Sequence, residues 1–173
     1  VVYGGNVALS GVLSSQKVGE KVDILAQECG QTAATKMTTV QTTTGGAFTA
    51  AVTPRKNTLY TAKVKNATSN AVSEKVRPRL RLRKVAPHRY SLRVFAAQSF
   101  AGKYGTLQRY NGTFRRWINV KRVLLRASST GIAPTVISSV TFRSSIRARL
   151  KIRVVLSQVG TCYVPGRSNV ILS

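Results

Sequence analysis

Acidic residues are nearly absent from this chain of 173 residues, which has four Asp and Glu residues against 28 Lys and Arg residues. All four acids precede residue 78, so residues 78–173 contain none. Paired-carboxylate catalysis and carboxylate-bound metals are therefore excluded from the second half of the chain. The net charge of +24 comes from missing acids rather than from abundant bases, because only 18% of the residues are charged.

Histidine and long apolar runs are also lacking. The only histidine, His88, stands in the segment Ala86–Arg89 with no acid in its half of the chain, and no Gly-x-Ser-x-Gly motif supplies a nucleophile. We therefore interpret His88 as an exposed turn residue and expect a protein that is not an enzyme and holds no metal or cofactor. No apolar run approaches the roughly 18 residues of a membrane span, so we expect no transmembrane segment.

Short alternating runs of polar and apolar residues fill the chain, and turn residues separate them. The first half has six: Val7–Leu13, Lys21–Gln27, Met37–Thr44, Ala47–Val52, Thr58–Val64 and Ala71–Val76. The second half continues with Arg79–Arg83, Tyr90–Val94, Gly105–Tyr110, Trp117–Val123, Thr135–Phe142, Ile146–Val154 and Asn169–Leu172. Strands recurring about every 8 to 12 residues predict β-sandwiches. We expect an all-β protein of two tandem immunoglobulin-like sandwiches, each with about seven antiparallel strands.

A charge step and an internal repeat place the domain boundary. Val18–Gln27 aligns with Ala101–Arg109, and Thr61–Val64 with Arg149–Ile152, which gives a repeat of about 90 residues suited to tandem domains. Residues 1–77 carry nine Lys and Arg residues and all four acids, whereas residues 78–173 carry 19 bases and no acid. We therefore predict domains at 1–77 and 78–173, joined stiffly because Pro78 restricts the residue before it.

A family resemblance follows from motifs spread over nearly the whole chain. They are Gly19-Glu20-Lys21-Val22, Ala26-Gln27-Glu28-Cys29-Gly30, Gly45-Gly46-Ala47-Phe48, Val52-Thr53-Pro54, Asn57-Thr58-Leu59-Tyr60 and Val76-Arg77-Pro78-Arg79, followed by Gly102-Lys103, Leu107-Gln108-Arg109-Tyr110, Trp117 and Tyr163–Ser168. Together they resemble tandem immunoglobulin-like domains of secreted bacterial surface proteins of the actinobacterial type. The resemblance implies a secreted or cell-surface protein with a structural role and no chemistry. The loss of acids after residue 77 departs from that family.

A structural role leads to an expectation about partners. We expect a non-enzymatic extracellular structural or adhesive module that self-associates, as in a surface fibre, or contacts other surface proteins. The terminal segments Val1–Tyr3 and Val170–Leu172 have the composition of strands that could pair with a neighbouring subunit. The chain starts at Val1 without an initiator Met, which fits a processed or a trimmed chain.

The two cysteines, Cys29 and Cys162, fall in different predicted domains, and neither has a partner in its own. Three arrangements remain open at this point. The two cysteines form a disulfide with each other, they form disulfides between neighbouring subunits, or both are free. An unpaired exposed thiol would be unusual in a secreted protein.

Basic residues at every second position carry the strongest functional signal. On a strand, Arg147, Arg149, Lys151 and Arg153 would all point to one face, about 7 Å apart. A second row is Arg79, Arg81 and Arg83, and further bases near Trp117 are Arg115, Arg116, Lys121 and Arg122. Such a face would attract an anionic polymer: nucleic acid, an acidic glycan or a cell-wall polymer. The competing interpretation is a solvated strand face that only keeps the protein soluble.

Overall fold

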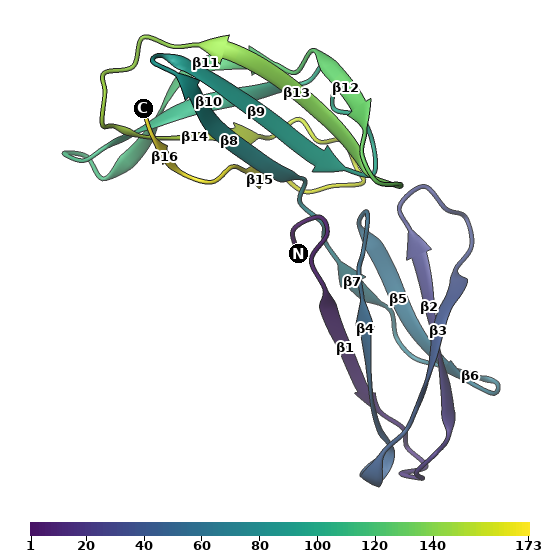
Figure 1. Cartoon of the computed structure of the whole chain (residues 1–173). Coiled ribbons are helices and arrows are strands. Elements are labelled where there is room, and N and C mark those ends of the chain that lie inside the picture. The colour runs from purple at the N-terminus through teal and green to yellow at the C-terminus, as the bar shows by residue number, and fades with distance from the viewer. The chain divides into compact units, whose positions relative to one another are not determined.

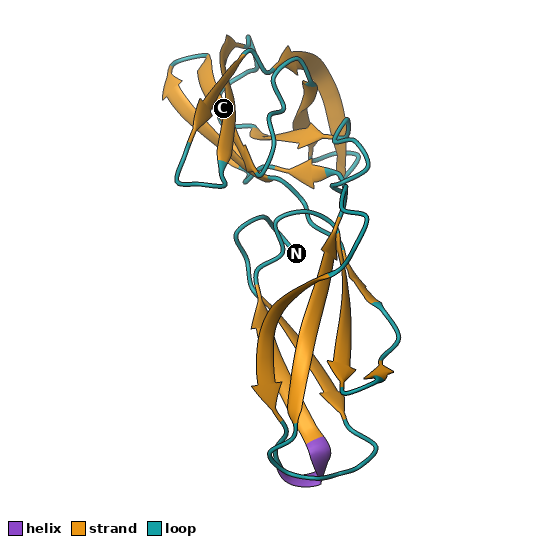
Figure 2. Ribbon diagram, turned by 90° about the vertical axis from the view of Figure 1, so that its right-hand side faces the viewer, coloured by secondary structure: helices purple, strands orange, loops and turns teal.

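The protein is all-β, as the alternating runs predict. The structure is a computed structural model that describes all 173 residues. It contains 16 strands, β1 to β16, and one 3-10 turn at Thr44–Gly46 (Figure 2). The chain separates into two compact units, Val1–Val76 and Arg77–Ser173 (Figure 1). No helix in it has the length and apolar character that crossing a bilayer demands.

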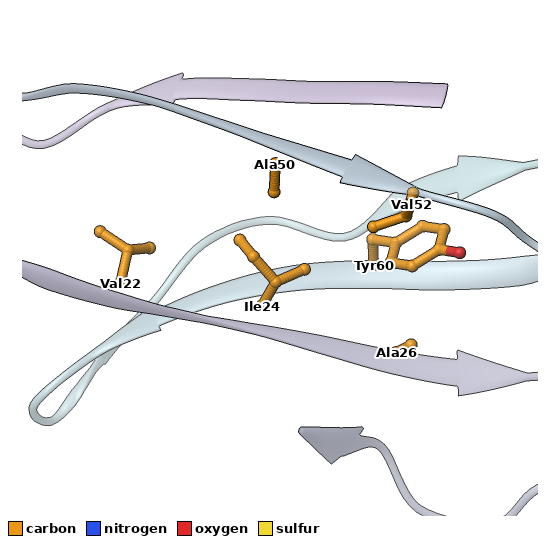
Figure 3. Close-up of a cluster of buried hydrophobic side chains, with 6 residues drawn as sticks. All are labelled: Val22, Ile24, Ala26, Ala50, Val52 and Tyr60. Atoms are coloured by element: carbon orange, nitrogen blue, oxygen red, sulfur yellow. The ribbon is translucent and has the colours of Figure 1, made fainter. Parts of the chain in front are cut away.

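The first unit consists of two antiparallel sheets. One has only two strands, β1 (Val7–Val12) and β4 (Ala47–Val52). The other has the order β3-β2-β5-β6, formed by Thr35–Gln41, Lys21–Glu28, Thr58–Val64 and Ala67–Thr68, and β7 (Val72–Glu74) also pairs with β5. The side chains between the two sheets come from alternate positions of β2, β4 and β5, as expected for strands with one buried face. They are Val22, Ile24, Ala26, Ala50, Val52 and Tyr60 (Figure 3).

The second unit is built on two larger antiparallel sheets. The first has the order β12-β13-β9-β8, formed by Ala127–Thr130, Val136–Arg143, Arg89–Ala96 and Arg79–Ala86. The second has the order β11-β10-β14-β15, formed by Arg116–Leu124, Tyr104–Asn111, Lys151–Leu156 and Gly166–Arg167, and β16 (Ile171–Leu172) also pairs with β14. Inward positions of both sheets are buried and apolar, for example Leu82, Leu92, Leu107 and Val154. The alternate positions therefore face solvent.

The internal repeat holds at the level of hydrogen bonds. Gly19 and Gly102 both have a positive φ, and each precedes a central strand, β2 or β10. The Gly19 N–H donates to the Thr42 carbonyl, directly after β3, and the Gly102 N–H donates to the Leu125 carbonyl, directly after β11, both at 2.8 Å. Both hairpins also contain a register shift, after Ile24 in β2 and after Leu107 in β10. The two units therefore share one hairpin design.

The second predicted alignment, of Thr61 with Arg149, is wrong. Thr61 on β5 pairs with Leu25 of β2, whereas Arg149 lies in a turn before β14. By its pairing with β10, the position equivalent to Thr61 is Arg153. The sequence match was short, and it lies four positions away from the equivalence that strand pairing gives.

The two ends of the chain are already engaged. Ile171–Leu172 forms β16 and pairs with β14, and the Val1 amino group donates to the Lys75 carbonyl at 2.7 Å. The pairing with β14 uses one edge of β16, so strand addition through Val170–Leu172 stays a prediction.

Candidate polyanion-binding face

Six arginines share the outer face of the β12-β13-β9-β8 sheet, which we call the arginine face. Leu80, Leu82, Leu92 and Val94 are buried, so the intervening positions on β8 and β9 point outward. On β13, Phe142 contacts buried Tyr90, and Arg143 therefore lies on the outer side. The face consists of Arg79, Arg81 and Arg83 on β8, Arg89 and Arg93 on β9, and Arg143 on β13, all of them exposed.

Strand register places like charges directly opposite each other on this face. Arg81 pairs with Arg93 across β8 and β9, and Arg89 pairs with Arg143 across β9 and β13. Side chains in such positions have Cβ atoms roughly 5 Å apart, and like charges there are destabilising. Nothing within the unit relieves the repulsion, because residues 77–173 contain no acid. Two such pairs therefore lower the stability of this one sheet face.

Arginine chemistry suits an oxyanion partner. The guanidinium group is planar and presents a fork of donors that matches carboxylate and phosphate groups. The guanidinium carbon of Arg79 lies 4.6 Å from the centre of the Phe95 ring, and the residue remains exposed. Along β8, successive outward arginines are about 7 Å apart, so a chain of anions could contact several at once.

The predicted row from Arg147 to Arg153 does not lie on one strand. Strand β14 begins at Lys151, and residues 144–150 form a loop in which Arg149 has a left-handed φ of 64°. The Arg149 and Leu150 backbone N–H groups both donate to Ser173, at 3.3 Å to its carbonyl and 3.1 Å to its hydroxyl. The apolar alternation is real, since Ile146 is buried, but it anchors a loop rather than defining a strand. Arg147 and Arg149 are exposed on that loop.

The bases predicted near Trp117 separate into different surroundings. Arg115 lies in the β10–β11 turn, and Arg116 begins β11 with its guanidinium 5.2 Å from the Phe114 ring. The Lys121 amine donates to the Arg143 carbonyl and lies 5.7 Å from the Phe142 ring. Arg122 lies 4.0 Å from the Tyr104 ring. Lys121 thus contacts the arginine face through the Arg143 backbone carbonyl, whereas Arg115, Arg116 and Arg122 belong to the β10–β11 hairpin.

The histidine and the two cysteines lie outside the arginine face. His88 is exposed in the turn between β8 and β9, with a φ of 57°. No group of three or more His, Cys, Asp or Glu side chains gathers in a way that could hold a metal ion. Cys29 and Cys162 are both disulfide-bonded, and neither thiol is free.

Three residues of the arginine face were not singled out from the sequence: Arg89, Arg93 and Arg143. The signal for Arg93 was present, since it alternates with Leu92 and Val94 in a predicted strand. The cross-strand register that places it opposite Arg81 was not. Comparison with known proteins adds no relative: no protein-family model matches the chain, and no curated protein is similar enough to count as a match.

Proposed function

We propose that the second unit binds an anionic polymer through the arginine face and performs no chemistry on it. The observation that supports this best is the pair of like-charge contacts, Arg81 with Arg93 and Arg89 with Arg143, in a unit without acids. A polymer bearing phosphate, sulfate or carboxylate groups would supply the missing counter-charge. Binding would release the counterions condensed on the polymer, and it would not depend on base or sugar sequence.

We place this binding outside the cytoplasm, in a structural or adhesive module of the cell surface. The disulfide-bonded state of Cys29 and Cys162 supports this location, because such bonds persist in oxidising compartments. The resemblance to secreted bacterial surface domains agrees with it. Acidic glycans and cell-wall polymers are then the ligands to test first, with nucleic acid as the comparison.

A quadruple variant tests the arginine face. Arg81, Arg89, Arg93 and Arg143 are replaced by Gln, and binding to labelled polygalacturonate, heparin-like oligosaccharide and single-stranded DNA is measured at several salt concentrations. The control replaces four exposed arginines outside the arginine face, at positions 115, 116, 147 and 149, so both proteins lose the same charge. For single-stranded DNA, losing four phosphate contacts should flatten the slope of log affinity against log salt by roughly 3.

Two results would contradict the proposal. One is a binding affinity that does not change with salt in the unaltered protein. The other is an equal loss of affinity in the quadruple variant and its control, which would mean that net charge alone attracts the polymer. A clear preference for one of the three probes would identify the ligand class.

A second candidate function, self-association, is favoured by an open strand edge in the first unit. Strand β9 of the second unit pairs with β13 on one edge and with β8 on the other (Figure 1). In the first unit the equivalent strand is β1, because it precedes the β2–β3 hairpin as β9 precedes the β10–β11 hairpin. Strand β1 pairs only with β4. Beside the free edge lies a groove of about 1020 Å³, lined by Leu9, Phe48, Tyr60 and Val64 among others.

We infer that this groove could accept a strand of a second copy, which would make the chain a fibre subunit. An added strand would satisfy the free backbone groups of β1 and cover apolar side chains, as β8 does for β9. Light scattering and negative-stain imaging over a range of concentration and salt test this. A protein that stays monomeric in every condition rules the candidate out while leaving the polyanion proposal untouched.

A further inference from the structure

Three polar side chains form a chain of hydrogen bonds on the outer face of the other sheet of the second unit. Gln108 on β10 lies opposite Asn119 of β11 on one side and opposite Arg153 of β14 on the other. The Arg153 Nε–H donates to Gln108 Oε1 at 2.9 Å, and Gln108 Nε2 donates to Asn119 Oδ1 at 2.8 Å. The network therefore crosses three neighbouring strands.

Arginine fixes the direction of this network. A guanidinium group has donors only, so Gln108 must turn its oxygen toward Arg153 and its nitrogen toward Asn119, which accepts with its own oxygen. Both amide oxygens thereby accept a hydrogen bond from within the network. The N–H groups left over are the terminal NH₂ groups of Arg153, one N–H of Gln108 and the NH₂ of Asn119. A ligand that meets these donors must bring acceptors.

The Arg153 side chain is held in place before any ligand arrives. Its guanidinium carbon lies 4.0 Å from the centre of the Trp117 ring, so the side chain reaches from β14 across β10 to β11. The residue is half-buried, whereas Arg167 on the neighbouring β15 is exposed. Burial lowers the pKa of the Arg153 guanidinium from its usual value, and the charge of Arg167 lowers it further. The positive charges of Arg153 and Arg167 therefore act on each other, and the second unit has no acidic side chain to neutralise them.

The first unit shows that the fold does not require this network. Its equivalent hairpin carries Leu25 where the second unit has Gln108, and Leu25 pairs with Lys36 and Thr61. An apolar residue, a lysine and a threonine thus form an equally regular three-strand row. The polar network is therefore a feature of the second unit and not a condition for pairing three strands.

We propose that Arg153, Gln108 and Asn119, with Arg167 beside them, form a preorganised site for a single oxyanion group: a phosphate, a sulfate or a carboxylate. It lies on a different sheet from the arginine face and does not depend on it. The arginine face offers many exposed charges to a polymer, whereas this site offers a fixed fork and amide donors to one group. The Trp117 ring packs against the Arg153 guanidinium group.

Trp117 is also the only tryptophan of the chain, so its fluorescence reports on this site alone. The full chain is titrated with inorganic phosphate, with sulfate and with glucuronate at constant ionic strength, and with chloride as the reference. We expect saturable changes in emission with oxyanions, half-complete on the order of millimolar concentration, and none with chloride. The relative effect of the three anions identifies the group that fits.

Variants separate this site from a general charge effect. Arg153→Gln should weaken the titration at least tenfold, and Arg167→Gln, a change at an exposed position, should weaken it severalfold without disturbing the fold. The quadruple variant of the arginine face should titrate as the unaltered protein does. An equal response to chloride, or full retention of the titration in both Arg153→Gln and Arg167→Gln, would overturn the proposal. Failure of polymer binding in the quadruple variant would leave it standing.

Discussion

Arg81 and Arg93 lie directly opposite each other on the antiparallel strands β8 and β9, with both side chains exposed. Arg83, two residues further along β8, lies opposite Ser91 instead. Arg81 and Arg83 lie on the same strand and are both exposed, yet only Arg81 faces a like charge. This difference allows the repulsion to be measured.

Reversing one charge of the pair should stabilise the second unit. We expect Arg81→Glu to raise its free energy of unfolding by about 1 kcal/mol at low salt, because repulsion with Arg93 becomes attraction. Arg83→Glu makes the same change in net charge without an opposing arginine and should gain less. Denaturant unfolding of both variants at low salt and in about 1 M salt, where the Debye length is about 3 Å, tests this. Equal stability of the two variants would show that the opposed pair has no cost of its own.

Tyr90 carries a buried hydroxyl without a hydrogen-bond partner, and burial raises the pKa of its phenol above the usual value. We expect Tyr90→Phe to stabilise the second unit by about 1 to 2 kcal/mol, since an unsatisfied polar group is removed. Tyr163→Phe is the contrasting variant, because the Tyr163 hydroxyl accepts from the Ala97 N–H at 2.9 Å. Tyr163→Phe should lower the free energy of unfolding by about 1 kcal/mol. Thermal unfolding would contradict this account if both variants moved in the same direction.

Gly45 and Gly46 share a φ of 75° but differ in the space around them. A Cβ atom on Gly46 would lie 2.8 Å from the Leu13 carbonyl oxygen, whereas one on Gly45 would meet nothing within 4 Å. Gly45→Ala should therefore cost only the left-handed strain, about 1 to 2 kcal/mol, and Gly46→Ala about 3 kcal/mol or more. Chemical denaturation of the first unit measures both. Equal losses would mean that the turn can shift to admit the methyl group.

Asp23 makes the first unit sensitive to acid. Its carboxylate is 2.7 Å from the Lys36 amine and accepts from the Thr39 hydroxyl at 2.6 Å, and these bonds hold its pKa below the ordinary value of 3.8. A lowered pKa stabilises the folded state above pH 3.8, and this contribution is lost as the pH falls through the lower folded value. The stability difference between the unaltered protein and Asp23→Asn should therefore close below that pH. A constant difference down to about pH 2 would contradict the assignment.

The cysteines give a chemical test of the covalent state. An alkylating reagent added to the denatured chain should modify no thiol before reduction and both Cys29 and Cys162 after it, because both are disulfide-bonded. Mass spectrometry counts the added groups. The size of the unreduced chain in a denaturing gel then distinguishes a bond within one chain from a bond between two. Any modification before reduction would show a free thiol.

The strand pattern of this chain could be predicted because each strand buries one face. Leu80 and Leu82 alternate with arginines, and Val22 and Ile24 with polar residues, so the period of two is visible in the sequence. The same reasoning failed at Ile146, where a buried side chain anchors a loop with the spacing of a strand. Periodicity records which residues are buried, and a short loop can bury alternate residues as well.

The sites were less predictable because they depend on register. Alternation alone identified Arg79, Arg81 and Arg83. Arg93 becomes part of the candidate site only because the register of β8 and β9 places it opposite Arg81. The link from Arg153 to Gln108 joins residues 45 positions apart in the sequence. No local pattern reveals such a contact, since pairing between distant strands decides it.

The absence of acids from the second unit has a consequence for how its ligand can be identified. Between about pH 5 and pH 8, histidine is the only side-chain type that ordinarily changes its charge, and this unit has one, His88, in the exposed turn directly before Arg89 of the arginine face. The net positive charge of the unit is therefore nearly constant over that pH range. A steep change of binding with pH that persists when His88 is replaced by Asn must belong to the ligand, so it reports the ionisation of the partner rather than that of the protein.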